Sequence, residues 1–200
     1  MIKFSNVSKV IKKKEVLSNI TLTLTTGNCY LLTGHNGSGK TMLLRLLAGL
    51  IAPSSGIIKS PKDYFYGVII ENPNFLNNET VYRNLELLAK INNHISSAQI
   101  DFYLTYFDLI NMKNSSVKKL SLGMNQRLAL CQAFMENQDV ILLDEPFNAL
   151  DAENTTKLIN LIKQEKENGK IIVVAAHNIS SEMESIFDKV FTMINGTISS

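Results

Sequence analysis

Two short segments of the chain are apolar almost without interruption. They are residues 140–146, VILLDEP, and residues 170–177, KIIVVAAH. Such runs are typical of parallel strands that are covered on both faces. Residues 20–27, ITLTLTTG, instead alternate between apolar residues and threonine, which predicts a strand with one exposed face. A further strand is expected at residues 29–34, where an apolar run leads into a glycine-rich turn.

Longer segments repeat apolar residues at the spacing of one helical face. Helices are expected over residues 40–50, 80–91, 98–110 and 153–168. The core-facing residues should be Val81, Leu85, Leu88 and Ile91 in the second, Ile100, Leu104, Phe107 and Ile110 in the third, and Leu158, Leu161 and Ile162 in the last. The last helix joins two buried strands, and strand, helix and strand at this spacing form a parallel crossover unit.

The middle of the chain is helical and loop-like and offers no clear strand pattern. We therefore expect an α/β fold in a single domain, residues 1–200. Its core should comprise residues 1–71 and 136–200, interrupted by a helical subdomain at residues 72–135. A chain of 200 residues is long enough to give such a domain a substantial core.

Composition and charge narrow the classes of function. A hydrophobic content of 45% indicates a globular chain rather than a disordered one. The net charge of +2 is too small to indicate nucleic acid or a membrane surface as a partner. Lys12, Lys13 and Lys14 form only a short basic cluster, as in a hairpin tip or a solvated loop. Cys29 and Cys131 lack metal-type spacing and are expected to be reduced and buried.

The segment GHNGSGKT, residues 34–41, carries the most specific chemical signal. It fits the pattern G-x-x-x-x-G-K-[ST], follows a predicted strand and opens a predicted helix, as this phosphate-binding motif requires. Its glycines let backbone N–H groups surround phosphate oxygens at a helix N-terminus. Lys40 would neutralise the β- and γ-phosphates, and Thr41 would give a hydroxyl to Mg²⁺. The candidate nucleotide-binding residues are Gly34, His35, Asn36, Gly37, Ser38, Gly39, Lys40 and Thr41.

Two adjacent carboxylates close the run at residues 140–146, at the sheet edge where ligands bind in open α/β folds. Beside a phosphate-binding loop, Asp144 would hold Mg²⁺ through its water shell, and Glu145 would orient and deprotonate an attacking water. His177 follows the other buried strand and should lie at the same edge. It is either a donor to the γ-phosphate or a structural histidine, and the sequence leaves both open.

Ser121 begins a helix-like segment, KKLSLGMNQRLAL, at residues 118–130. One interpretation is a helix N-cap. The other is a second phosphate-binding surface, made by the Ser121 hydroxyl and the free N–H groups that lead to Gly123. A single domain has no evident need of two such surfaces for one phosphate chain.

These motifs, in this order, resemble those of the nucleotide-binding subunit of an ABC transporter over essentially the whole chain. GHNGSGKT is similar to the Walker A motif, VILLDEP to the Walker B motif with its catalytic glutamate, LSLGM to the family signature, NALD at residues 148–151 to the D-loop, and His177 to the switch histidine. The resemblance implies a RecA-like P-loop NTPase core with a mainly parallel sheet, an N-terminal antiparallel β part and an inserted helical subdomain. It also implies ATP and Mg²⁺ as cofactors.

In that family two subunits face head to tail, and the signature of each closes on the ATP held by the other. Ser121 and Gly123 would then touch the γ-phosphate of that ATP, and Asp151 would couple the two sites. The second ATPase subunit would be a copy of this chain or a close paralogue. A separate permease is also implied, because no stretch approaches 18 apolar residues and the first residues lack a signal-peptide core. The expected location is the cytoplasmic face of the cell membrane.

Three features depart from the family's pattern. Leu122 and Met124 replace the usual glycine and glutamine of the signature, while Ser121 and Gly123 are kept. Ile11 stands where an aromatic ring usually stacks on adenine, and base–aromatic stacking is worth on the order of 1–3 kcal/mol in single-strand nucleic-acid binding. Glu71 stands where the family normally has glutamine, at the loop that joins core and helical insert.

The glutamate variant together with the LSLGM signature resembles exporters of the bacitracin-resistance and lantibiotic-immunity type. The first hypothesis is therefore the ATP-hydrolysing subunit of an exporter for an antimicrobial peptide, drug or amphiphile, with no nucleic-acid partner. The alternative is a soluble ABC-type ATPase acting on nucleic acid or the ribosome, but such relatives carry a coiled-coil insert or two cassettes. A non-hydrolysing regulator is opposed by Glu145. For the aromatic residues 101–109, core packing is favoured over docking of Tyr103 or Tyr106 on the permease.

We predict weak discrimination between ATP and GTP, because Ile11 keeps apolar contact with the base but offers no ring to stack on it. Comparing the two hydrolysis rates checks this, and a much more efficient hydrolysis of ATP would contradict it.

We also expect nucleotide binding and turnover to depend more steeply on Mg²⁺ than in a Glu71→Gln variant. A carboxylate is a stronger Mg²⁺ ligand than an amide oxygen, but it repels phosphate when metal is absent. Mg²⁺ titrations of the two proteins make the comparison, and identical curves would return Glu71 to the role of a solvated loop residue.

Overall fold

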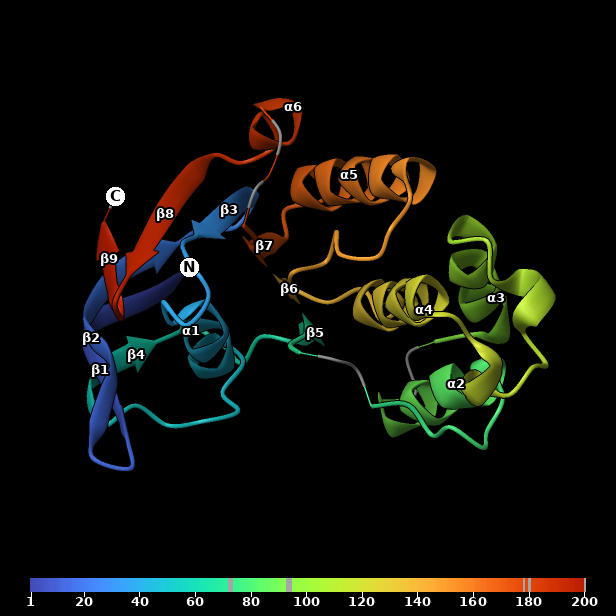
Figure 1. Ribbon diagram of the computed structural model, residues 1–200, viewed down its shortest axis with the longest axis horizontal. Coiled ribbons are helices and arrows are strands. Elements are labelled where there is room, and N and C mark those ends of the chain that lie inside the picture. Colours follow the sequence, from blue (N-terminus) through green and yellow to red (C-terminus); the bar gives the residue numbers. More distant parts are fainter. Residues whose placement is uncertain (72–73, 93–94, 178, 180, 200) are drawn as a thin grey trace.

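The chain folds around two β-sheets and a group of helices (Figure 1). The structure is a computed structural model and describes residues 1–71, 74–92, 95–177, 179 and 181–199. The larger sheet runs through the middle of the molecule. The smaller sheet lies at one end, and the helical group lies at the other (Figure 1).

The larger sheet has the strand order β5-β6-β7-β3-β8-β9. Its strands are β3 (Asn28–Thr33), β5 (Tyr66–Ile69), β6 (Val140–Asp144), β7 (Ile171–Ala175), β8 (Lys189–Ile194) and β9 (Thr197–Ser199). All neighbouring strands are parallel except β8 and β9. Every residue of β6 and β7 is buried, which explains why their sequences are continuously apolar. The predicted mainly parallel sheet is confirmed.

Two apolar cores lie on opposite faces of this sheet, because successive side chains of a strand point to opposite faces. In β7, Ile172 and Val174 join one core, and Ile171 and Val173 join the other. The first core is closed by the helix α5 (Ala152–Glu167) and by the helical group. The second is closed by the helix α1 (Lys40–Leu47) and by the smaller sheet.

The smaller sheet is antiparallel and has the order β2-β1-β4. Its strands are β1 (Ile2–Ile11), β2 (Lys14–Leu24) and β4 (Ser55–Lys59). Lys12 and Lys13 form the turn between β1 and β2, and both have positive φ angles, 47° and 68°. The N-terminal antiparallel part of the fold prediction is confirmed, and the alternating strand expected at residues 20–27 is the end of a longer one.

The helical group is inserted between β5 and β6. It contains α2 (Val81–Asn92), α3 (Ser97–Tyr106) and α4 (Leu122–Phe134), with 3₁₀ turns η1 (Ile110–Met112) and η2 (Val117–Lys119). The last helix of the chain, α6 (Ser181–Glu184), is short.

Three details of the helix prediction are corrected. Ile91 is 74% exposed and does not face the core, although Val81 and Leu85 of the same helix are buried. The third helix stops at Tyr106 instead of residue 110, because the backbone turns left-handed at Asp108, with φ of 55°. The first helix ends at Leu47, ahead of Gly49, whose φ is 68°.

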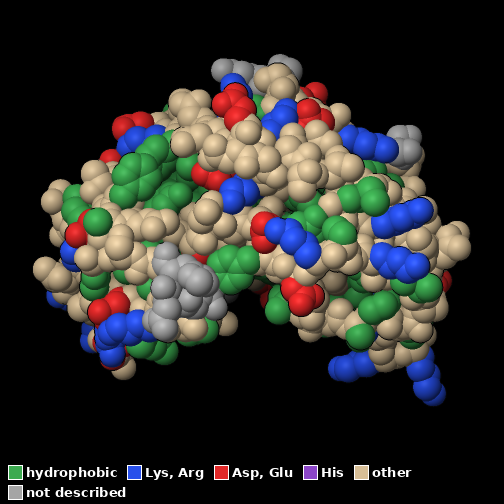
Figure 2. Space-filling model, turned by 180° about the vertical axis from the view of Figure 1, so that it is seen from behind, with side chains coloured by type: hydrophobic (Ala, Val, Ile, Leu, Met, Phe, Trp, Pro, Cys, Tyr) green, Lys and Arg blue, Asp and Glu red, His purple; other side chains and the backbone are tan. Residues whose placement is uncertain are grey.

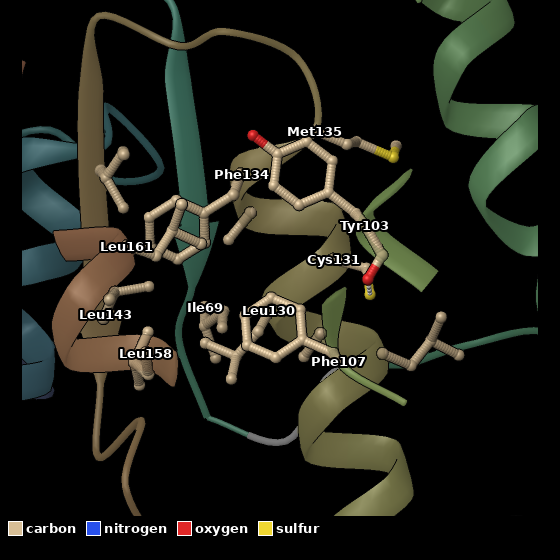
Figure 3. Packing of buried hydrophobic residues seen from close by; sticks show 14 of the residues in the cluster. Ile69, Tyr103, Phe107, Leu130, Cys131, Phe134, Met135, Leu143, Leu158 and Leu161 are labelled. Atoms are coloured by element: carbon tan, nitrogen blue, oxygen red, sulfur yellow. Dashed lines mark hydrogen bonds between the residues drawn. The ribbon is translucent and has the colours of Figure 1, made fainter. Parts of the chain in front are cut away.

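Aromatic and aliphatic side chains join the helical group to the larger sheet. Figure 3 shows Tyr103, Phe107, Leu130, Cys131, Phe134 and Met135 packed beside Ile69, Leu143, Leu158 and Leu161. Tyr103 is 9% exposed, and the Tyr106 hydroxyl donates a hydrogen bond of 2.8 Å to the carbonyl oxygen of Lys157. Both tyrosines therefore contribute to internal packing. Cys29 and Cys131 are buried free thiols, and burial raises the pKa of each.

The surface seen from behind carries charges of both signs (Figure 2). Basic side chains are frequent over the end with the smaller sheet, and acidic and basic side chains are mixed elsewhere on this face (Figure 2). None of the helices in the described part of the chain combines the length and apolar character needed to span a bilayer.

We predict that Phe107→Ala lowers the free energy of unfolding by about 3–5 kcal/mol, because the ring is fully buried and its removal leaves a cavity. Phe102→Ala is the matched control: this ring is 58% exposed, and the loss should stay near about 0.5 kcal/mol. Urea unfolding measures both, and equal losses would contradict the packing described here.

Candidate nucleotide-binding and hydrolysis site

The site lies where β3, β6 and β7 end, at one edge of the larger sheet. Leu32 of β3 and Asp144 of β6 both pair with Ala175 of β7, so the three strands end in register. A cavity of about 640 Å³ opens at this edge. It is lined by Lys14, Glu15, Val16, Asn36, Gly37, Gly39, Lys40, Thr41, Met42, Arg45, Glu71, Asp144, Glu145, Asn195 and Gly196.

The loop from Gly34 to Gly39 needs its glycines for two physical reasons. Gly34 and Gly39 have positive φ angles, 144° and 111°. In addition, a Cβ atom on Gly34 would lie 2.4 Å from the carbonyl oxygen of Met193, and one on Gly39 would lie 2.8 Å from Leu17 Cδ2. The loop is thus pressed against β8 and β2, and its backbone is held in a conformation that other residues rarely adopt.

The N-terminus of α1 is prepared to bind an anion. No described side chain caps it, so the first N–H groups of the helix remain available to a ligand. The buried hydroxyl of Ser38 likewise has no hydrogen-bond partner among the described residues. Lys40 Nζ donates to the carbonyl oxygen of Gly34 at 2.7 Å, which holds the ammonium group across the loop. These donors fit the phosphates of a nucleotide.

Thr41 and Asp144 meet at the floor of the cavity. Thr41 Oγ1 donates a hydrogen bond of 2.6 Å to Asp144 Oδ2. Burial raises the pKa of Asp144, and the negative charges of Glu145 and Glu71 add to this rise, while the Thr41 hydrogen bond opposes it. A hydroxyl and a carboxylate are hard oxygen ligands, so this pair fits Mg²⁺. The structure brings together Thr41 and Asp144, two of the three residues that the sequence assigned to metal binding.

Glu145 and His177 also meet. Glu145 has a φ of 49° and its N–H donates to the carbonyl oxygen of Ala175 at 2.8 Å, which turns the side chain out of the strand. His177 Nδ1 lies 2.7 Å from Glu145 Oε1. A second cavity, of about 290 Å³, is lined by His177 together with Thr33, Gly34, His35 and Asn36. The hydrogen bond to Glu145 is a role for His177 that neither interpretation of the sequence included.

Glu71 lies at the cavity but is not an isolated carboxylate. Its Oε1 forms an ion pair of 2.7 Å with Arg45 Nη2, and both side chains line the cavity. Its backbone is left-handed, with φ of 60°. Arg45 was not among the site residues predicted from the sequence. Its signal was that, apart from Lys40, it is the only charged residue in the apolar segment KTMLLRLLAGL.

Part of the cavity lining comes from β2 and from the turn between β8 and β9. Lys14, Glu15 and Val16 come from β2, and Asn195 and Gly196 come from the turn, where Gly196 lies directly against Val16. These five residues were not predicted from the sequence, because they lie outside every motif.

Ile11 is not among the residues that line the cavity; it pairs with Lys14 across the hairpin and is 36% exposed. The structure therefore places Ile11 outside the lining of the cavity that the loop at residues 34–41 forms.

Ser121 and Gly123 lie apart from this cavity, and none of its described lining residues comes from the helical group. Ser121 is the N-cap of α4 and accepts a hydrogen bond of 3.2 Å from Met124 N. A Cβ atom on Gly123 would lie 2.7 Å from the carbonyl oxygen of Ala149, so the helix start touches the loop after Glu145. Leu122 is 73% exposed between them.

The loop at residues 146–151 connects Glu145 to α5. Gln126 Nε2, from α4, donates a hydrogen bond of 3.1 Å to the carbonyl oxygen of Pro146, a contact that the sequence analysis missed. Asp151 is the N-cap of α5 and accepts a hydrogen bond of 2.8 Å from Asn154 N. This hydrogen bond lowers the pKa of Asp151.

A glycine-rich loop that opens a helix, beside two carboxylates at the carboxyl edge of a parallel sheet, defines a P-loop nucleoside triphosphatase. Residues 17–148 match the family model described as ABC transporter. The chain therefore belongs to the ABC transporter family as an ATP-binding domain, and its enzymatic class is ATPase. The resemblance that the motifs carried is confirmed.

The chain is similar over most of its length to other members of the family. It is 39% identical to the ABC transporter ATP-binding protein YybJ of Bacillus subtilis (strain 168), covering 99% of this chain and 94% of that protein. It is 32% identical to the bacitracin transport ATP-binding protein BcrA of Enterococcus faecalis, covering 98% of this chain and 67% of that protein. A dimeric post-hydrolysis structure of the ATP-binding cassette MJ0796 with ADP and Pi matches with a TM-score of 0.90, 25% identity, and coverage of 100% of this chain and 97% of that one.

We predict that Gly123→Ala lowers the ATPase rate by about 100-fold, because the added methyl group displaces the loop that follows Glu145, and misplacement of about 1 Å can cost this much. Nucleotide binding should persist, since Gly123 does not line the cavity. Turnover and nucleotide affinity measured on the same protein separate the two effects, and an unchanged rate would contradict the tight contact with Ala149.

Proposed function

We propose that the protein is the ATP-hydrolysing subunit of an ABC exporter, which dimerises on ATP and drives a separate membrane permease. The observation that carries this proposal is the pair of contacts at the sheet edge, Thr41 to Asp144 at 2.6 Å and Glu145 to His177 at 2.7 Å, beside the cavity that holds Lys40. A metal-binding pair and a candidate general base therefore flank one phosphate-binding loop.

In this proposal the backbone N–H groups of residues 34–41 and the Lys40 ammonium bind the phosphates of ATP. Thr41, Asp144 and Glu71 would hold Mg²⁺, which would neutralise phosphate charge when bound. Glu145 accepts the proton of the attacking water, and its buried neighbour Asp144 stays with the metal. His177 orients the Glu145 carboxylate and donates towards the γ-phosphate. Ile11 contributes only apolar contact near the base.

A second ATPase subunit, either a copy of this chain or a close paralogue, completes the site. Ser121 and Gly123 lie outside the cavity of their own subunit, which is consistent with a role towards the nucleotide of a partner. The exposed Leu122 would be covered by the same association. Asp151, exposed at the start of α5, would couple the two sites.

The proposal assigns different functions to two parts of the chain. Residues 1–71 and 136–200 form the nucleotide-binding core, and residues 72–135 form the helical subdomain that carries the signature. The permease holds the protein at the cytoplasmic face of the membrane. The similarity to a bacitracin transport protein supports export of a peptide, drug or amphiphile as the activity of the complex.

We predict that Glu145→Gln keeps nucleotide affinity, lowers ATP hydrolysis by at least about 100-fold and accumulates a dimer in ATP, because the base is lost while the binding groups remain. Turnover assays and size-exclusion chromatography measure these effects. Glu153→Gln, a 75% exposed glutamate on α5, is the matched control and should change neither. Lys40→Ala should lose turnover altogether. Hydrolysis by Glu145→Gln at the wild-type rate would remove Glu145 from the role of base.

Purification of the complex from its native cell distinguishes transport from the alternative. Recovery with a polytopic membrane protein is expected. Recovery with ribosomes or nucleic acid, without a membrane protein, would favour a soluble ABC-type ATPase.

A further inference from the structure

The ion pair between Arg45 and Glu71 lies directly on the nucleotide cavity. Arg45 belongs to α1, whose N-terminus opens on the cavity, Glu71 follows β5, and both side chains line the cavity. Arg45 Nη2 and Glu71 Oε1 are 2.7 Å apart, and the two side chains are 34% and 60% exposed. An ion pair this exposed contributes little to the stability of a fold. Its effect is therefore to be sought in the charge that it presents to the cavity.

The other charges around the cavity determine how this ion pair affects a bound phosphate. The lining contains three cations, Lys14, Lys40 and Arg45, and four carboxylates, Glu15, Glu71, Asp144 and Glu145. Glu71 is near enough to Asp144 for its charge to help raise the Asp144 pKa, after the larger effect of burial. A free carboxylate in this position would repel the phosphates of a nucleotide as well as Asp144. A cation at hydrogen-bond distance cancels most of that repulsion.

We propose that Arg45 is a positioning residue for Glu71, whose ion pair neutralises this carboxylate while no metal is bound and so lets glutamate occupy a wall that faces phosphate. The inference rests on the proposed function of the site, because it takes the cavity to be the place where the phosphates bind.

One expectation from the sequence changes as a result. The steep Mg²⁺ dependence expected of Glu71 assumed a carboxylate without a counter-ion. Because Arg45 supplies this counter-ion, the steep Mg²⁺ dependence is expected only of a variant that lacks Arg45. Metal-free nucleotide affinity of the wild type should be close to that of Glu71→Gln.

A double-mutant cycle tests the proposal by binding alone. The four proteins are the wild type, Arg45→Met, Glu71→Gln and the double variant, and the measurement is the dissociation constant of ADP in EDTA at low ionic strength. Arg45→Met should weaken binding roughly three- to thirty-fold, because an uncompensated carboxylate then faces the phosphates. Adding Glu71→Gln should restore the wild-type affinity. Saturating Mg²⁺ should bring Arg45→Met close to the wild type.

Salt gives a second readout that a purely structural role would not produce. The affinity loss of Arg45→Met should shrink at about 1 M salt, where the screening length is about 3 Å. Arg83→Met is the matched control, since Arg83 belongs to an exposed ion pair on α2 and does not line the cavity. Arg45→Gln serves as a second variant, and urea unfolding verifies that each protein is folded.

Three outcomes separate the possible failures. Equal metal-free affinity of the wild type and Arg45→Met would overturn the proposal. A loss that persists in the double variant would also overturn it, because Arg45 would then act on the nucleotide directly and not through Glu71. A wild-type protein that binds no ADP with or without Mg²⁺ would instead overturn the proposed function.

Discussion

The register of three parallel strands is the constraint on which the site depends. Ala175 of β7 pairs with Leu32 on one side and with Asp144 on the other, so β3, β7 and β6 end at one edge. That edge receives the glycine-rich loop, the Thr41–Asp144 pair and the Glu145–His177 pair. A slip of one residue in β6 would turn Asp144 to the opposite face of the sheet and separate it from Thr41. The two apolar cores prevent such a slip, because alternate residues of β6 and β7 are buried on both faces.

The cavity proposed to bind the phosphates has no excess of positive side chains among its described lining residues. Carboxylates are at least as numerous as cations around it, so the backbone supplies much of the attraction for phosphate. Uncapped N–H groups at the start of α1 and the positive end of its dipole provide this attraction at fixed positions. Each charged side chain named here has a fixed partner. Lys40 donates a hydrogen bond to the carbonyl oxygen of Gly34, Arg45 forms an ion pair with Glu71, and Asp144 accepts a hydrogen bond from Thr41. Each pair sets where a charge lies before a ligand arrives.

Helix α4 of the helical group contacts the loop after Glu145 directly. Gln126 holds the carbonyl oxygen of Pro146, and Gly123 permits the close approach of Ala149. A displacement of α4 therefore acts on the segment that begins with the candidate base and ends with Asp151. In the proposed dimer, α4 would serve the nucleotide of one subunit while it steadies the catalytic loop of its own. This gives a physical route by which two sites respond to each other.

The sequence by itself determined the class of fold and predicted the chemistry of the site. Its apolar runs and helical periods predicted the parallel sheet and its crossover, and its glycine-rich loop and paired acids predicted a phosphate site with a metal, because these signals are local and their spacing is fixed. Only the tertiary structure decided which charges meet. Several contacts join residues that are far apart in the chain: Arg45 with Glu71, His177 with Glu145, and Gln126 with Pro146. The cavity lining likewise includes both Glu15 and Asn195. Packing also decided the exposure of Ile91, and the left-handed turn at Asp108 decided the end of α3 at Tyr106, neither of which a helical period encodes. Contacts of this kind depend on how strands and helices are brought together, and no short stretch of sequence contains that information.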